Sequence, residues 1–155
     1  MKREFTVKTI GIIHTPFGKP ADAPIQGYFE PYAEGTIEVF GEYAYGLADV
    51  DGFSHLVLLY RFHEAKPPAL VVKPFLGDEL KGVFATRSPR RPNAIGLTVV
   101  RLLGREGNVL RVAGVDMLDE TPLLDIKPYV PNFDNRTDVR CGWLDDALRD
   151  GKETG

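Results

Sequence analysis

Residues 81–97 read KGVFATRSPRRPNAIGL and join two predicted strands, 82–86 and 95–103, through a short basic segment. Both flanking segments are rich in β-forming residues and lack a helical period. Pro89 and Pro92 fix φ, remove backbone donors and hold the residues before them in extended conformations. The stretch therefore predicts a strand-rich fold that carries a stiff cationic loop.

The charge of this segment differs from that of the whole chain, whose formal net charge is −3. Residues 81–91 contain no acid and four cations: Lys81, Arg87, Arg90 and Arg91. Guanidinium groups bind phosphate and carboxylate through paired hydrogen bonds. From charge alone two interpretations stay open: an anion-binding site, or a solvated hairpin whose arginines pair with acidic residues. The stiffness of the segment and the neighbouring Asn93 and Gly96 favour the site.

The strand pattern continues on both sides of the basic segment. Strands are predicted at 6–14, 36–40, 53–62, 109–117 and 123–126, helical turns at 42–50 and a short amphipathic helix at 143–149. The run 53–62, FSHLVLLYRF, is the most hydrophobic and predicts a central strand buried on much of both faces. Gly107 is predicted at the reversal of a hairpin. The sequence thus predicts a mainly β protein.

Length and composition predict one domain, 1–155, with a core at about 5–135 and a tail at about 136–155. The chain starts without a signal peptide and has no long apolar run, so a cytoplasmic location without membrane contact is expected. A single cysteine and three scattered histidines predict no metal. No glycine-rich strand-to-helix fingerprint occurs, which argues against a Rossmann-type enzyme.

Five stretches carry a resemblance to a known family. They are, in order, IGIIHTPF (10–17), APIQG (23–27), GFSHLVLLYRFH (52–63), TRSPRRPNAIGL (86–97) and DETPLLDIKPYVP (119–131). In this order they resemble the TrmO (TsaA-like) family of tRNA methyltransferases. Because they span most of the chain, the resemblance covers the predicted core as a whole.

The resemblance implies a single-domain, non-Rossmann β-barrel methyltransferase that is a homodimer. It would bind S-adenosylmethionine and methylate N6 of threonylcarbamoyl-adenosine at position 37, in the anticodon loop of tRNA. The residues it assigns to the cofactor are Pro24, Ile25, Gln26, His63, Glu64, Arg87, Leu97, Glu120, Thr121, Pro122 and Leu123. The residues predicted to bind that substrate are Arg90, Arg91, Asn93, Lys127 and Tyr129.

Catalysis by methyl transfer needs alignment and an acceptor for the N6 proton, without a covalent nucleophile. His63 and Asp125 are the candidates for that acceptor, with their roles unassigned, and His63 ranks above His55. Asp125 and Lys127 project to the same side of a predicted strand, where an exposed ion pair is the alternative. Tyr129 is suited to stacking on an unstacked base, although a core position is equally open.

One residue departs from the family pattern. Glu120 stands where a glycine is common, and glycine tolerates positive φ and close backbone approach more easily than glutamate. The contact with the cofactor is therefore expected to be rearranged at this position.

Two functions from other classes remain as alternatives. The first is a non-catalytic small β-barrel that binds RNA or an anionic metabolite through its basic loop. The second is a structural subunit that docks a partner through the proline-rich segment 67–74.

Overall fold

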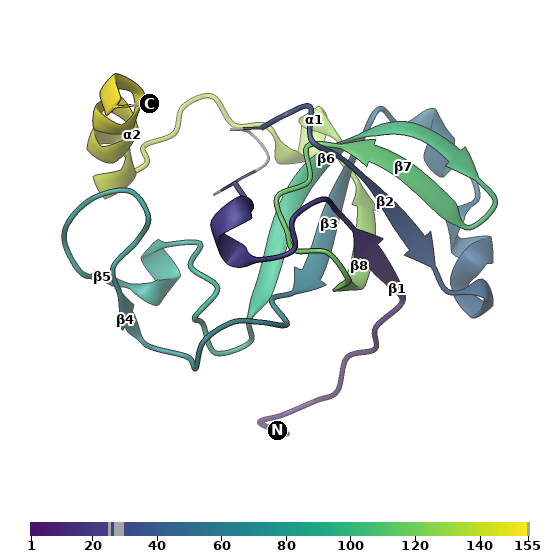
Figure 1. Ribbon diagram of the computed structural model, residues 1–155, viewed down its shortest axis with the longest axis horizontal. Helices are drawn as coiled ribbons and strands as arrows, with labels where there is room; N and C mark the ends of the chain where they lie inside the picture. The colour runs from purple at the N-terminus through teal and green to yellow at the C-terminus, as the bar shows by residue number, and fades with distance from the viewer. Residues whose placement is uncertain (25, 27–29, 155) are drawn as a thin grey trace. The chain divides into compact units, whose positions relative to one another are not determined.

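The computed structural model describes residues 1–24, 26 and 30–154 and is mainly β. Six strands form a closed barrel in the order β1–β2–β7–β6–β3–β8, with antiparallel neighbours throughout (Figure 1). These strands are Gly11–His14 (β1), Glu34–Val39 (β2), His55–Arg61 (β3), Ile95–Glu106 (β6), Val109–Ala113 (β7) and Thr121–Pro128 (β8). The predicted non-Rossmann β-barrel is confirmed.

The remaining elements are short. Val71–Val72 (β4) and Lys81–Gly82 (β5) form a separate two-stranded sheet. The 3₁₀ helices are Pro20–Asp22 (η1), Gly41–Leu47 (η3), Val50–Gly52 (η4) and Val83–Ala85 (η5), and the α-helices are Pro131–Asp134 (α1) and Trp143–Thr154 (α2). The helical turns predicted at 42–50 are confirmed, and the helix predicted at 143–149 begins as predicted and continues to Thr154.

The barrel wall has one buried face, because inward and outward side chains alternate along each strand. In β3 the inward side chains Leu56, Leu58 and Tyr60 are at most 2% exposed, whereas Val57 and Leu59 face outward and are half-buried. The predicted burial of much of both faces is thus complete on the inward face and only partial on the outward one. Burial of each leucine side chain stabilises the folded state by about 1.5–3 kcal/mol, so the interior supplies most of the stability of the barrel.

The predicted hairpin is confirmed as β6 and β7. Glu106 pairs with Val109 across a two-residue turn, and Gly107 in that turn has a φ of +62°. A positive φ is what tight hairpin turns require and what glycine adopts without steric cost. The second strand is shorter than predicted, since β7 ends at Ala113, before Gly114 with its φ of +94°.

Two predicted strands are shortened by what surrounds them. Only residues 11–14 of the predicted strand 6–14 form β1, because the partner strand β2 ends at Val39 and the chain then enters η3. The predicted strand 82–86 is mostly the turn η5, since both the amide and the hydroxyl of Thr86 donate to the carbonyl of Val83, at 3.1 and 2.8 Å. A hydroxyl that bonds its own backbone competes with strand pairing in this way.

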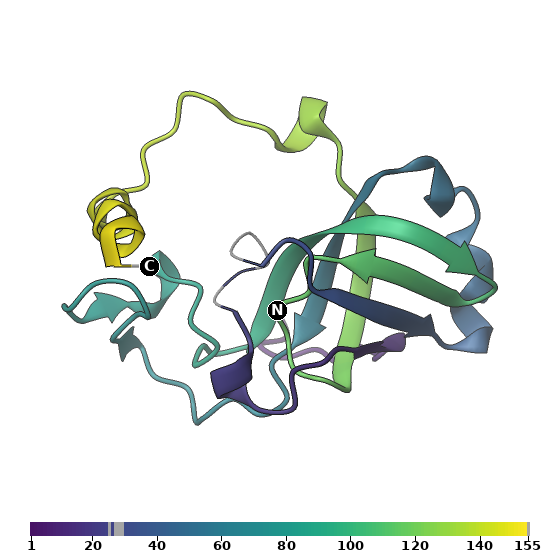
Figure 2. The ribbon, with the colours of Figure 1, turned by 45° about the horizontal axis from the view of Figure 1, so that its top comes forward.

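The chain groups into two compact units. The first, which we call the barrel unit, comprises 1–64 and 95–129. The second, the loop unit, comprises 65–94 and 130–155 and holds the small sheet, the basic segment and both α-helices. Within the loop unit, α2 lies beside the loop that joins β4 to β5 (Figure 2). Within the described ranges, no helix has the length and apolar character that a membrane span requires.

Candidate functional site

The basic segment folds as a loop without regular structure, which we call the arginine loop (86–94). Side-chain hydroxyls accept hydrogen bonds from backbone amides that no strand pairing satisfies. The amide of Ser88 donates to Thr86 Oγ1 at 3.2 Å, and the amide of Arg90 donates to Ser88 Oγ at 3.3 Å. The amide of Ala94 closes the loop on the carbonyl of Arg91 at 3.1 Å. Serine and threonine hydroxyls commonly satisfy turn backbone in this manner.

Arg91 holds the two ends of the turn together. Its Nη1 donates to the carbonyls of Thr86, at 2.9 Å, and of Ser88, at 3.2 Å, and the side chain is half-buried. A charged donor on a neutral carbonyl is stronger than a neutral pair, at about 1.5–3 kcal/mol. Arg91 is therefore first a structural part of the loop.

Arg90 is placed differently. It is exposed, its Nε donates to the carbonyl of Pro67 at 3.0 Å, and its own carbonyl accepts from the amide of Ala69 at 3.2 Å. Among the described residues no carboxylate pairs with Arg90 or Arg91. The open alternative that these arginines pair with acids thus finds no support. Among the described residues, the guanidinium groups of Arg90 and Arg91 contact only neutral carbonyls, which suits an anionic ligand.

The barrel unit gathers a second group of predicted residues at one end. Arg61 at the end of β3 pairs with Ile95 at the start of β6, and Ile13 on β1 pairs with Thr121 at the start of β8. We call this end of the barrel the motif rim. The predicted cofactor residues that lie in it, or within three residues of a strand end there, are His63, Glu64, Leu97, Glu120, Thr121, Pro122 and Leu123.

The loop from β1 to β2 starts and ends at the same rim. Pro24 and Gln26 belong to it and are half-buried, and Gln26 makes a polar contact. Ile25, the third residue assigned to the cofactor in this loop, lies outside the described residues.

Side-chain bonds fix the turn before β8. Asp119 Oδ1 accepts from the amide of Thr15 at 3.0 Å, and the amide of Asp119 donates to the carbonyl of Phe17 at 2.8 Å. After the turn, Thr121 Oγ1 donates to the carbonyl of Leu118 at 2.6 Å. Sequence reasoning missed Asp119 and Thr15; the signal was an acid in one motif and a threonine before proline in another, a pairing that only the barrel reveals.

Residues with a strained backbone occur in the arginine loop and in the turn before β8. The described non-glycine residues with positive φ are Asp49, Ala94 and Glu120, at 68°, 44° and 63°. The conformation of Glu120 agrees with the glycine expected there, because the turn needs a left-handed residue. Such positions cost of order 1–3 kcal/mol and cluster at functional sites.

Three predicted residues, Asp125, Lys127 and Tyr129, lie away from the motif rim. The amide of Tyr129 donates to the carbonyl of His55 at 3.1 Å, where β3 begins, and the two rings meet edge to face. From Thr121 to Tyr129 the chain runs eight residues, about 26 Å at roughly 3.3 Å each. Lys127 Nζ pairs with Asp125 Oδ2 at 3.1 Å, both side chains being largely exposed. The alternative of a surface ion pair is thus what the structure contains.

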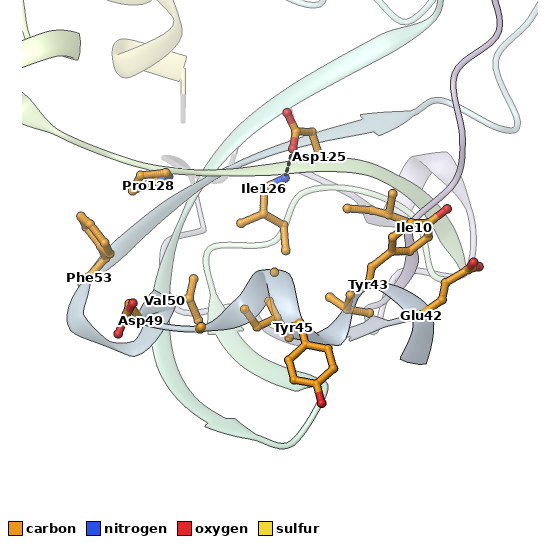
Figure 3. Close-up of a pocket in the computed structure, with 14 residues that line it drawn as sticks. Ile10, Glu42, Tyr43, Tyr45, Asp49, Val50, Phe53, Asp125, Ile126 and Pro128 are labelled. Carbon is orange, nitrogen blue, oxygen red and sulfur yellow. Dashed lines mark hydrogen bonds between the residues drawn. The ribbon is translucent and has the colours of Figure 1, made fainter.

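A cavity of about 580 Å³ lies at the opposite rim (Figure 3). Its lining includes Tyr43, Val50, Phe53 and Ile126. Asp125 borders it, but its carboxylate turns from the cavity and accepts from the amide of Ile126 at 2.9 Å. Apart from Asp125, none of the described residues predicted for the site lines this cavity. The arginine loop, in the loop unit, and the motif rim, in the barrel unit, are therefore treated as two separate candidate regions.

No group of three or more His, Cys, Asp or Glu side chains suited to a metal ion occurs in the described part of the chain. The predicted absence of a metal therefore stays a prediction.

Comparison with known proteins gives a consistent result. The family model described as the tRNA-methyltransferase O N-terminal domain matches residues 12–135. A probable S-adenosyl-L-methionine-binding protein of Pyrococcus abyssi is 57% identical over 138 residues, covering 89% of this chain and 75% of that protein. A human tRNA (adenine(37)-N6)-methyltransferase is 34% identical, covering 94% of this chain and 34% of that protein.

Among solved structures, the crystal structure of TrmO from Pseudomonas aeruginosa superposes with a TM-score of 0.78 at 40% identity. The match covers 94% of this chain and 63% of that one. The chain thus spans under two thirds of that solved relative and about a third of the human one.

Proposed function

The chain belongs to the family of the tRNA-methyltransferase O N-terminal domain, and we propose that it methylates tRNA with S-adenosylmethionine as donor. The target we propose is N6 of threonylcarbamoyl-adenosine at position 37, in the anticodon loop. The names of the human and Pyrococcus abyssi relatives support the reaction class and the cofactor. The observation that carries the proposal is the arginine loop, whose Arg90 and Arg91 have no carboxylate partner among the described residues.

For the cofactor, we propose the motif rim and the loop that precedes β2. The donor set there fits a polar, zwitterionic nucleoside: an amide from Gln26, an imidazole from His63 and carboxylates from Glu64 and Glu120. Pro24, Ile25, Leu97, Thr121, Pro122 and Leu123 complete the proposed set. The resemblance also assigns Arg87 to the cofactor, and we keep that assignment as a proposal.

For the substrate, we propose that Arg90 binds the carboxylate of the threonyl group or an adjacent phosphate. Only its Nε is engaged in the described part of the structure, so both Nη groups can form a fork with an anion. Arg91 and Asn93 would act beside it. Lys127 and Tyr129, at the opposite rim, would contact tRNA away from the reacting base.

S-adenosylmethionine supplies a methyl group activated by its sulfonium. The protein aligns the substrate nitrogen with that group, and a neighbouring acceptor takes the proton that N6 loses. We propose His63 for this role. Asp125 is less suited, because its two oxygens are engaged by the amide of Ile126 and by Lys127.

We also propose that the protein is a cytoplasmic homodimer. On the outer face of β6, Ile95, Leu97 and Val99 are 42%, 41% and 39% exposed, next to the half-buried Val57 and Leu59 of β3. A contiguous apolar strip on a sheet face is typical of a protein interface. Sedimentation of the purified protein would test this.

Mass spectrometry of nucleosides from tRNA incubated with the protein and S-adenosylmethionine tests the activity. One methyl group added to threonylcarbamoyl-adenosine is expected, and none on tRNA that lacks the threonylcarbamoyl group. His63→Gln should lower kcat by about a hundredfold or more. A wild-type protein that binds tRNA but neither binds the cofactor in calorimetry nor methylates would be the non-catalytic RNA-binding barrel instead.

A further inference from the structure

The C-terminal helix α2 lies outside residues 12–135, the part matched by the family model, yet it contacts the segment that leads into the arginine loop. Trp143, the first residue of α2, donates from Nε1 to the carbonyl of Ala85 at 2.8 Å. Ala85 is the last residue of η5 and lies two residues before Arg87. Both partners belong to the loop unit.

The indole is held in place from several sides. Gly77, whose φ is +90°, lies near the ring: a Cβ added to it would lie 3.6 Å from the indole, at ordinary van der Waals distance. Lys81 Nζ lies 5.8 Å from the ring centroid, within the range of a cation–π contact. Ala147, one turn further along α2, is 9% exposed and lies beside the same glycine. Trp143 is thus a fixed donor.

Two consecutive carbonyls at the entrance of the arginine loop are held by side chains. The carbonyl of Ala85 accepts from Trp143, and that of Thr86 accepts from Arg91 at 2.9 Å. The amide between them, that of Thr86, donates to Val83 at 3.1 Å. Because every polar group of this peptide is bonded, its plane is fixed, and with it the direction in which the chain enters Arg87.

We propose that Trp143 is a positioning residue, which orients the arginine loop for its anionic ligand through the carbonyl of Ala85. The bond to Ala85 requires an N–H at the edge of a large ring, which phenylalanine lacks. The proposal rests on the proposed function only where it names tRNA as that ligand.

The test compares wild type with Trp143→Phe, which keeps a ring and removes the donor. Asp146→Ala is the matched control, because Asp146 is exposed on the same helix. Hydrogen exchange is measured at the bonded amides of Ser88, Arg90 and Arg91 and at barrel amides. We expect exchange about fivefold faster in the loop of Trp143→Phe alone, with the barrel amides unchanged, which is the size of effect that removing one neutral hydrogen bond produces.

A second arm measures tRNA binding across a salt series. Trp143→Phe should bind about fivefold more weakly, and the slope of log K against log salt should become shallower by about 0.7–0.9 for each phosphate that the loop no longer neutralises. A merely structural loss of stability would not change that slope. Unchanged loop exchange in Trp143→Phe would overturn the proposal. If the wild type binds tRNA, an affinity and a salt slope in Trp143→Phe equal to those of the wild type would also overturn it. If loop exchange is faster in Trp143→Phe but the wild type itself does not bind tRNA, the proposed function is rejected and the positioning role of Trp143 stands.

Discussion

The barrel wall and the arginine loop are held together by different interactions. In the wall, strand ladders and side chains such as Leu58 and Leu110, which are fully buried, supply the stability. In the loop, Thr86, Ser88 and Arg91 bond backbone groups directly, and exposed charge remains. The stability of the barrel and the binding of a ligand thus rest on separate residues, so variants should change one with little effect on the other.

The largest effect is expected in the wall. Leu58→Ala should lower the free energy of unfolding by about 2–5 kcal/mol, because it removes a fully buried side chain and leaves a cavity. Urea denaturation followed by circular dichroism measures it. A loss below about 1 kcal/mol would mean that the barrel interior is less tightly packed than its burial indicates.

The next effect is expected in the loop. Arg91→Ala should weaken tRNA binding at least about tenfold, since it removes the donor to two carbonyls together with a charge. The urea midpoint should fall by less than it does in Leu58→Ala, because both bonds of Arg91 lie within the loop unit, outside the barrel interior. Arg140→Ala is the matched control: it removes an equal charge from an exposed site of the same unit, outside the loop. Equal losses in both variants would show that only net charge matters.

A smaller effect of opposite sign is expected at the motif rim. Glu120→Gly should stabilise the protein by about 0.5–1 kcal/mol, because glycine adopts the φ of +63° without steric cost. Asp49→Gly is the control, with a φ of +68° but an aspartate, which tolerates this region better, so its gain should be smaller. Thermal unfolding measures both. Destabilisation by Glu120→Gly would show that the carboxylate makes a contact worth more than the strain.

The smallest effect is expected at the exposed ion pair. Asp125→Asn should change the free energy of unfolding by less than about 0.5 kcal/mol, because its partner Lys127 is 61% exposed and water screens the pair. It should change kcat less than about twofold if His63 accepts the proton. A loss of kcat comparable to that of His63→Gln would return Asp125 to the catalytic role.

The sequence predicted the parts of the molecule that depend on local rules. Runs of apolar and β-forming residues placed the strands around Leu58 and Val100, and Gly107 marked the hairpin turn. The glycine preference at Glu120 anticipated a left-handed backbone. These features need only the conformational preferences of a few neighbouring residues.

Other parts depended on contacts between distant segments and were not predictable. The strand expected at 82–86 became a turn, in which the hydroxyl of Thr86 donates to the backbone carbonyl of Val83 three residues earlier. The pairing of Asp119 with Thr15 joins residues 104 positions apart. Tyr129 and Lys127 shared a motif with Glu120, yet a strand of eight residues carries them to the other rim. Because a strand rises about 3.3 Å per residue, residues that are close in sequence along it can lie far apart in space.

Calorimetric titration of Arg90→Ala with tRNA and with S-adenosylmethionine tests the separation of roles most directly. Arg101→Ala, which removes an equal exposed charge from the barrel wall, is the control. We expect Arg90→Ala to bind tRNA about tenfold more weakly and the cofactor within about twofold of wild type, while Arg101→Ala retains both affinities within about twofold. Unchanged tRNA affinity in Arg90→Ala, or loss of cofactor binding with tRNA binding intact, would contradict it.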